Sequence, residues 1–228
     1  MTKENTLTFA NTHRDFVTQL NRRVSDYFHA NNISRHGNGE MYFKTVCMFA
    51  AYFTPYVLIL TGVISGIVPL LLSVLVMGLG LAGIGLSVMH DANHGAYSRK
   101  AWVNSLMGYS LNLVGANAFN WKVQHNVLHH TFTNVVDHDE DISPRGVLRL
   151  SPETPWKKAH RFQFIYAWFL YGLMTIAWLG YKDFSRLVRY HRARFSGSKK
   201  ANFSREWLIL IATKLAYISY IFVVPMLL

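Results

Sequence analysis

The chain has 228 residues, 51% of them hydrophobic, and a formal net charge of +11. This apolar content excludes an intrinsically disordered protein, and the length fits a single domain. Only 15% of the residues are charged, below the roughly 25% that is typical of soluble globular chains, so the composition indicates a membrane protein. The positive charge is then explained by membrane topology, and we do not expect a nucleic-acid partner.

The first predicted element is an amphipathic helix over residues 12–30, where Phe16 and Leu20 begin a series of apolar residues at helical spacing. We expect this helix to lie on the bilayer surface or on the folded domain. Residues 31–39 are rich in Asn, Ser and Gly and predict a loop. Residues 1–40 lack the apolar core of a signal peptide, so we expect them to form a cytoplasmic N-terminal segment.

A long uncharged region follows this segment. Residues 45–89 contain no Lys, Arg, Asp, Glu or His, and they are more than twice as many as the roughly 20 residues that one spanning helix needs. Gly66 and Pro69 interrupt helical continuity near the middle of the region. The sequence therefore predicts a transmembrane helical hairpin with spans of about 43–62 and 67–89.

The second span contains Gly78-Leu-Gly80-Leu-Ala-Gly83, which fits the GxGxxG pattern of dinucleotide-binding loops. It lacks the preceding strand and the βαβ context that such a loop requires. We expect these glycines to allow close packing of two helices instead.

Two groups of histidines follow the hairpin, His90-Asp-Ala-Asn-His94 and His125-Asn-Val-Leu-His129-His130. Residues four apart on a helix lie on one face, so each group can present a pair of imidazoles to one ion. His130 comes one residue later and points about 100° around an α-helix, toward a different ion. All-imidazole sites favour iron, zinc, copper or nickel over magnesium or calcium. Two such metals beside a bilayer indicate oxygen activation on a lipid substrate, because redox-active iron supports chemistry that zinc cannot.

Three further helices are predicted between and after these groups. Residues 101–121 carry several asparagines among apolar residues and predict an interfacial helix. Residues 162–181 are apolar enough to span, but crossing would place basic residues on both sides, so we expect a surface or partly embedded helix. Residues 207–228, interrupted only by Lys214, predict a third span. The expected fold is an all-α integral membrane protein, with a helical hairpin, a third span, and cytoplasmic and interfacial helices that carry the histidine groups.

In combination with Asp137-His-Asp-Glu-Asp141, the two groups resemble the histidine boxes of membrane fatty acid desaturases. The resemblance is to the front-end type that includes bacterial linoleoyl-CoA desaturase-like enzymes, and it covers the chain from about Met41 onward. It implies a multi-pass membrane enzyme with two iron ions, which uses O2 and two electrons to remove two hydrogens from an acyl-CoA or acyl-lipid. It also implies histidine boxes on the cytoplasmic side of the membrane. The implied iron ligands are His90, His94, His125, His129 and His130.

The chain departs from this family at its third box, H/Q-x-x-H-H, which has no match in residues 131–228. Five imidazoles are too few for the di-iron centre of the family. We therefore expect residues 41–228 to be a C-terminally incomplete desaturase domain that is inactive on its own. No haem-binding extension is visible, so we expect electrons from a separate donor of the ferredoxin or cytochrome b type.

Several residues near the boxes have two interpretations. Asp91, Asn93 and Asn126 either orient the ring N–H of a ligand or lie on the helix surface. Trp121 either lines the acyl tunnel or anchors at the membrane interface. The acidic run 137–141 orients ligands, meets a partner, or forms a solvated loop.

The basic stretch from Arg145 to Arg205 is expected to face anionic membrane lipid, with the phosphates of an acyl-CoA as the alternative.

Three other functions remain as alternatives. A membrane di-iron lipid hydroxylase shares such boxes and adds an oxygen to its product. A zinc metalloprotease would need a Glu beside His90, where the chain has Asp91. A metal transporter or haem protein, which is no enzyme, would place ionisable ligands at membrane depth, and residues 45–89 contain none.

Overall fold

The computed structural model describes residues 14–142, 147–193 and 202–228. Every regular element in these ranges is a helix. The all-α expectation is therefore confirmed. Residues 12–13 of the predicted surface helix, and residues 145–146 and 194–201 of the basic stretch, lie outside the described residues.

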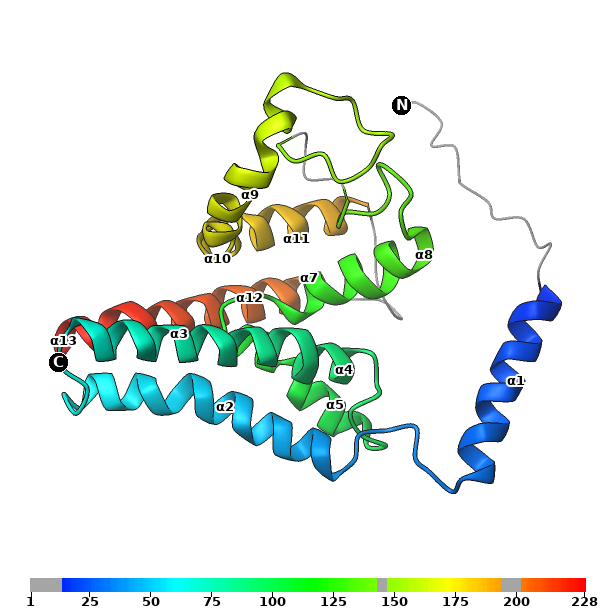
Figure 1. Ribbon diagram of the computed structural model, residues 1–228, viewed down its shortest axis with the longest axis horizontal. Coiled ribbons are helices and arrows are strands. Elements are labelled where there is room, and N and C mark those ends of the chain that lie inside the picture. Colours follow the sequence, from blue (N-terminus) through cyan, green and yellow to red (C-terminus); the bar gives the residue numbers. More distant parts are fainter. Residues whose placement is uncertain (1–13, 143–146, 194–201) are drawn as a thin grey trace.

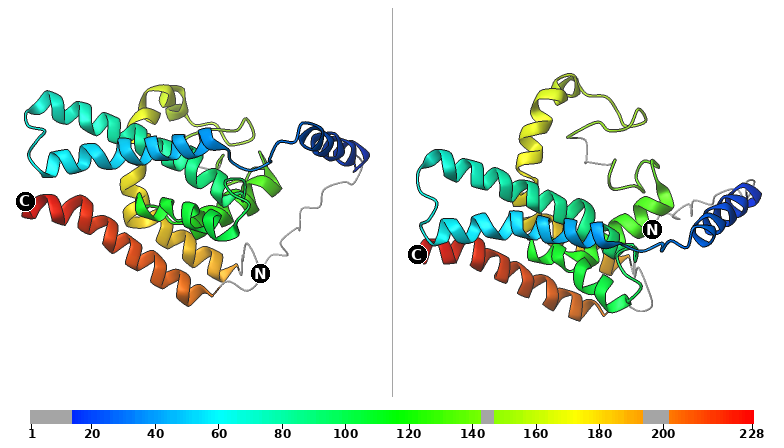
Figure 2. Two further views of the ribbon diagram at one scale, coloured as in Figure 1. Left: turned by 90° about the horizontal axis from the view of Figure 1, so that it is seen from below. Right: turned by 60° about the horizontal axis from the view of Figure 1, so that its bottom comes forward.

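Three helices are long and apolar enough to cross a membrane, and few of their residues are buried inside the molecule. Figures 1 and 2 show them side by side, with the α2–α3 turn and the C-terminus at the same end. The predicted hairpin and third span are thus confirmed. The first span is α2 (Gly39–Leu60); the second is α3 (Ile67–Gly83), η1 (Ile84–Val88) and α4 (Met89–Asn93); the third is α12 (Phe203–Ile218), η5 (Ser219–Val223) and α13 (Val224–Leu227).

The first two spans pack closely because glycines of the second face the first. A Cβ atom at Gly80 would lie 2.7 Å from the backbone nitrogen of Tyr52 and 2.9 Å from the carbonyl oxygen of Met48. A Cβ atom at Gly83 would overlap the Met48 side chain. Gly80 and Gly83 of the GxGxxG pattern therefore allow close helix packing, as predicted, whereas a Cβ atom at Gly78 would meet nothing within 4 Å.

The predicted interfacial helix over residues 101–121 is instead three short helices, α5 (Ala101–Gly108), α6 (Ser110–Leu113) and α7 (Ala118–Lys122). The chain breaks where Gly115 adopts a φ of +90°, a conformation that favours glycine. Three of the asparagines that suggested an interface are buried, namely Asn112, Asn117 and Asn120. Asn112 donates to Thr213 and Asn120 to Asp183, both far along the chain, whereas Asn117 accepts from the amide of Asn120 at the start of α7.

The apolar segment over residues 162–181 is also broken. It begins in the short η3 (Lys158–Phe162) and α9 (Gln163–Gly172), which meet the following helices at a bend of 55°. By length and composition it is a fourth span only if the bent pair is counted as one. The helices after the bend are α10 (Met174–Ala177), η4 (Trp178–Lys182) and α11 (Asp183–Arg192).

The N-terminal helix α1 (Arg14–Ala30) stands apart from the other helices in Figures 1 and 2. None of its residues is buried, and Phe16 is 65% exposed. Packing on the domain, one of the two expected positions, is therefore not observed.

Candidate metal centre

The first histidine group lies at the end of the second span. The amide of Met89 donates to the carbonyl of Ile84 five residues earlier, so the span passes through a π-helical turn just before this group. His90 lies within α4, and His94 follows the last residue of that helix. The rings of His90 and His94 have centroids 4.6 Å apart, as the four-residue spacing predicted.

The second group lies on a π-helix, η2 (Val123–His129), continued by α8 (His130–Phe132). The amide of His130 donates to the carbonyl of His125, five residues earlier. This wider turn places residues five apart on one face, and the ring centroids of His125 and His130 lie 4.8 Å apart. The sequence analysis placed His130 about 100° around an α-helix, and the π-helical turn instead brings its ring close to that of His125. That His130 serves a different ion stays a prediction.

His125 is central among the five imidazoles. Its ring centroid lies 5.2 Å from those of His90, His94 and His129, and that of His130 is nearer still. One ring nitrogen of each of His90, His94 and His125 lies within 4.8 Å of the others, close enough for three ligands of a single ion. The two sequence-distant boxes are thus brought together.

His125 also fits a metal ligand chemically. Its Nε2 is buried and has no hydrogen-bond partner among the described residues. Burial and the neighbouring histidines lower the pKa of His125 to about 4, and burial also lowers the pKa of His94. Both imidazoles are therefore neutral near pH 7, the form that binds a metal ion.

A buried carboxylate orients His129. The Nδ1 of His129 donates to both oxygens of Asp139, at 3.0 and 3.1 Å. Burial would raise the pKa of Asp139, but hydrogen bonds from the amides of Asn134 and Asp141 and from His129 outweigh it, so this pKa is lowered. Because Nδ1 is taken by the carboxylate, Nε2 of His129 is the nitrogen left for a metal.

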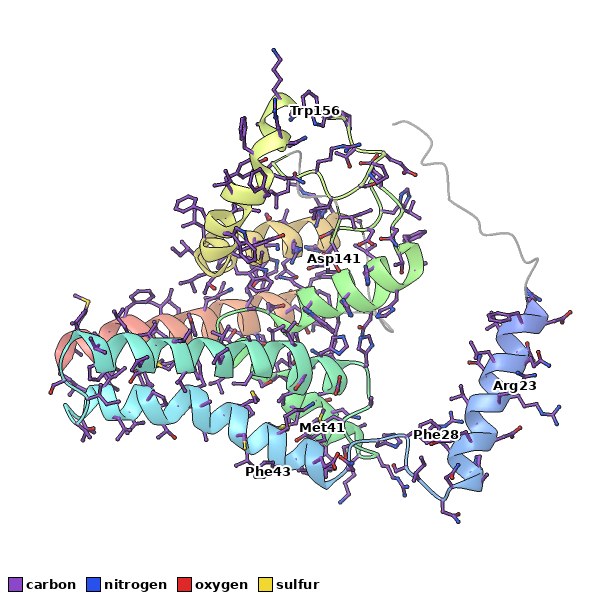
Figure 3. All side chains as sticks on the ribbon, in the orientation of Figure 1. Arg23, Phe28, Met41, Phe43, Asp141 and Trp156 are labelled. Atoms are coloured by element: carbon purple, nitrogen blue, oxygen red, sulfur yellow. The ribbon has the colours of Figure 1, made fainter. Side chains whose placement is uncertain are left out.

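Two further carboxylates lie beside ligand rings. Asp91 Oδ1 lies 3.1 Å from His90 Nδ1, as expected for a residue that orients a ring. Asp141 Oδ2 lies 3.5 Å from His129 Nδ1 and 3.9 Å from His125 Nδ1, and Figure 3 shows Asp141 between α11 and the helix of the second box. His125, His129 and Asp141 also lie close enough to hold an ion. Since Asp139 already accepts from Nδ1 of His129, we interpret Asp141 as a negative charge beside the rings of His125 and His129 and not as an ion ligand.

The two asparagines inside the boxes join the boxes to each other. Asn126 Nδ2 donates to the carbonyl of Asn93 at 2.9 Å, and Asn93 Nδ2 donates to the sulfur of Met89 at 3.4 Å.

Trp121 stacks on His125 at a centroid distance of 4.3 Å and an interplanar angle of 25°. The tryptophan therefore packs against the histidine cluster.

Sequence reasoning missed how the acidic run is held. Glu140 pairs with Arg186, 3.3 Å away, and with Arg189, and it accepts a hydrogen bond from Tyr190 at 3.2 Å. Two features of the sequence could have indicated these ion pairs: the acidic residues of the run, and the basic, amphipathic composition of residues 183–192.

Comparison with known proteins places this arrangement in context. The family model described as fatty acid desaturase matches residues 65–228. The chain is 37% identical to an sn-1 linoleoyl-lipid 6-desaturase of Arthrospira platensis over 72% of this chain and 44% of the relative. It is 34% identical to an sn-1 linoleoyl-lipid 6-desaturase of Synechocystis sp. over 93% of this chain and 58% of the relative.

An acyl-lipid (8-3)-desaturase of Physcomitrium patens is 35% identical over 98% of this chain and 46% of the relative. The chain therefore spans about half the length of these curated relatives. No solved structure matches it significantly.

Proposed function

The chain belongs to the fatty acid desaturase family, and on that premise we propose that its histidine cluster is the iron-binding part of an oxygen-dependent desaturase that introduces a double bond into an acyl chain. The observation that carries the proposal is the convergence of five imidazoles on His125 at the end of the spans. When bound, the iron pair supplies the oxygen chemistry that removes two hydrogens from adjacent methylenes, with O2 and two electrons as co-substrates.

The residues of the cluster have distinct roles in this proposal. The five histidines hold iron, while Asp139 and Asp91 keep the rings of His129 and His90 in the orientation that exposes Nε2. Trp121 covers one side of His125 with an apolar ring and keeps water from that side. We further propose that this ring borders the path of the acyl chain.

The proposed substrate is an acyl chain esterified in a lipid. The relatives described above are named as lipid desaturases, and this favours acyl-lipid over acyl-CoA. We propose that the histidine boxes and the basic stretch face the cytoplasm, with the bent helices 162–181 on the membrane surface. A separate ferredoxin or cytochrome b type protein then delivers the electrons.

The experiment measures iron bound to the chain in lipid nanodiscs under anaerobic Fe²⁺. We expect His125→Ala to remove most of the bound iron and His29→Ala, a histidine of the separate helix α1, to leave it unchanged. Equal iron binding by wild type and His125→Ala would contradict the proposal.

Because residues 131–228 hold no third box, we expect fewer than two irons per chain and no desaturation by the 228 residues alone. Product mass tests this in the presence of lipid, reductant and O2. Loss of two hydrogens would contradict the expected inactivity, and gain of one oxygen would identify a hydroxylase.

A further inference from the structure

Lys214 is the one charged residue in residues 207–228, and it is buried, with 3% of its surface exposed. Its ammonium group donates to Asp183 Oδ2 at 2.7 Å, to the carbonyl of Gly115 at 2.6 Å and to the carbonyl of Trp178 at 2.9 Å. An ammonium has three protons, so these three acceptors satisfy it completely. Ionisable residues within spans are costly, and they are retained mainly where they serve a function.

Asp183 connects Lys214 to α7, the helix that precedes the second box, because it bonds to a residue of each. It is the first residue of α11 and is 2% exposed. Asn120 Nδ2 donates to the carbonyl oxygen of Asp183 at 2.8 Å and lies 3.4 Å from its Oδ1. Asn120 is itself fully buried in α7. Three elements distant in sequence therefore meet at Lys214, Asp183 and Asn120.

A second contact from the same span reaches the same segment. Asn112 Nδ2 donates to Thr213 Oγ1 at 3.2 Å, and Asn112 Oδ1 accepts from the amide of Ala118, the first residue of α7, at 3.0 Å. The adjacent residues Thr213 and Lys214 of the third span are thus linked, through Asn112 and Asp183, to two residues of α7.

This segment continues without a break into the metal centre. Trp121 follows Asn120 directly and stacks on His125, and α7 runs straight into the π-helix that carries the box. A π-helix is rare and depends on its surroundings to persist, so the placement of its first turn decides where His125 lies.

We propose that Lys214, Asp183 and Asn120 are positioning residues that hold the second histidine box in register against the third span. The inference rests on the proposed function. A well-packed apolar pair stabilises a fold as well as a buried ion pair does, so stability alone does not account for retaining the charges. What the charges add is directional bonding, which fixes α11 and α7 on α12 in one arrangement.

The test compares four variants of the chain in lipid nanodiscs by hydrogen–deuterium exchange of residues 118–130. Lys214→Met removes the ammonium. Lys214→Met/Asp183→Asn removes it without leaving an unpaired buried carboxylate, so this variant keeps the proposal testable if the first does not fold. Asn120→Ala removes the last link. Leu210→Ala, fully buried one turn earlier on α12, is the packing control.

We expect residues 118–130 to exchange faster than in wild type in the three variants of Lys214, Asp183 and Asn120. Leu210→Ala should not show this faster exchange, even if it loses as much thermal stability as they do. Co²⁺, used as a probe, should bind roughly 10- to 100-fold more weakly to Lys214→Met/Asp183→Asn than to wild type, even if the two proteins have the same thermal stability. Exchange that follows thermal stability alike in all four variants would overturn the inference. If the wild type binds no Co²⁺ or Fe²⁺, the proposed function fails, while the exchange comparison still decides the positioning role.

Discussion

The Nδ1 of His129 lies 3.0 Å from the nearer oxygen of Asp139, a carboxylate ten residues later that is fully buried. The loop between them returns to the helix because the amides of Asn134 and Asp141 also donate to this carboxylate. One acidic side chain thus fixes the loop and the orientation of a proposed metal ligand together.

Replacing Asp139 should weaken metal binding without unfolding the protein. We expect Asp139→Asn to lower Co²⁺ affinity roughly 10- to 100-fold, because His129 loses its charged acceptor and the orientation of its ring. Titration followed by the visible spectrum of bound Co²⁺ measures the change. Asp137→Asn is the matched control, since Asp137 is exposed and its φ of +69° suits Asn. Equal affinity of both variants would contradict the role of Asp139.

The contact between the two boxes predicts a smaller effect. Asn126→Ala removes the hydrogen bond to the carbonyl of Asn93, and we expect a loss of about 1 kcal/mol in the free energy of unfolding together with weaker Co²⁺ binding. Thermal unfolding followed by tryptophan fluorescence, with and without Co²⁺, measures both. Asn31→Ala, an exposed asparagine of the N-terminal loop, should change neither.

Gly115 should not tolerate a side chain. Its φ of +90° is unfavourable for other residues, and a Cβ atom would lie 2.8 Å from the ring of Tyr217. We expect Gly115→Ala to destabilise the fold by about 1–3 kcal/mol. Gly172→Ala, where a Cβ atom meets no neighbour within 4 Å, is the control for adding a methyl group. Equal unfolding temperatures of Gly115→Ala and Gly172→Ala would contradict this account.

The charge of Lys182 should make stability depend on pH. Burial, and then the positive charge of Arg186, lower the pKa of Lys182 from 10.5 to about 8, although nearby carboxylates partly offset this. The unfolded chain therefore holds this proton more tightly than the folded chain, so the cost of the charge is complete below pH 8. That cost disappears as the pH rises from about 8 toward 10.5.

We accordingly expect Lys182→Met to unfold at a higher temperature than wild type near pH 7, with a difference that shrinks toward about pH 10. Lys100→Met removes the same charge from an exposed position and should show no such trend. A constant difference between wild type and Lys182→Met across this range would refute the assignment.

Local composition was sufficient to predict the spans. A helix in lipid must be apolar over its whole length, so the uncharged residues 45–89 could be placed without any tertiary information. The pairing of His90 with His94 was equally local, because four-residue spacing sets the face of a helix. The break at Gly115 was not predicted, since a glycine that adopts positive φ is recognised only from its surroundings.

The sequence by itself therefore determined which helices are apolar enough to span a membrane and the residue types of the candidate metal centre. Only the tertiary structure decided that the second box is a π-helix, which turns His130 toward His125 where an α-helix would direct it away. It also decided the partners of Asp139 and Lys214, because a buried charge bonds to whichever groups the fold brings to it. Periodicity describes one helix at a time, whereas these contacts depend on how several helices pack.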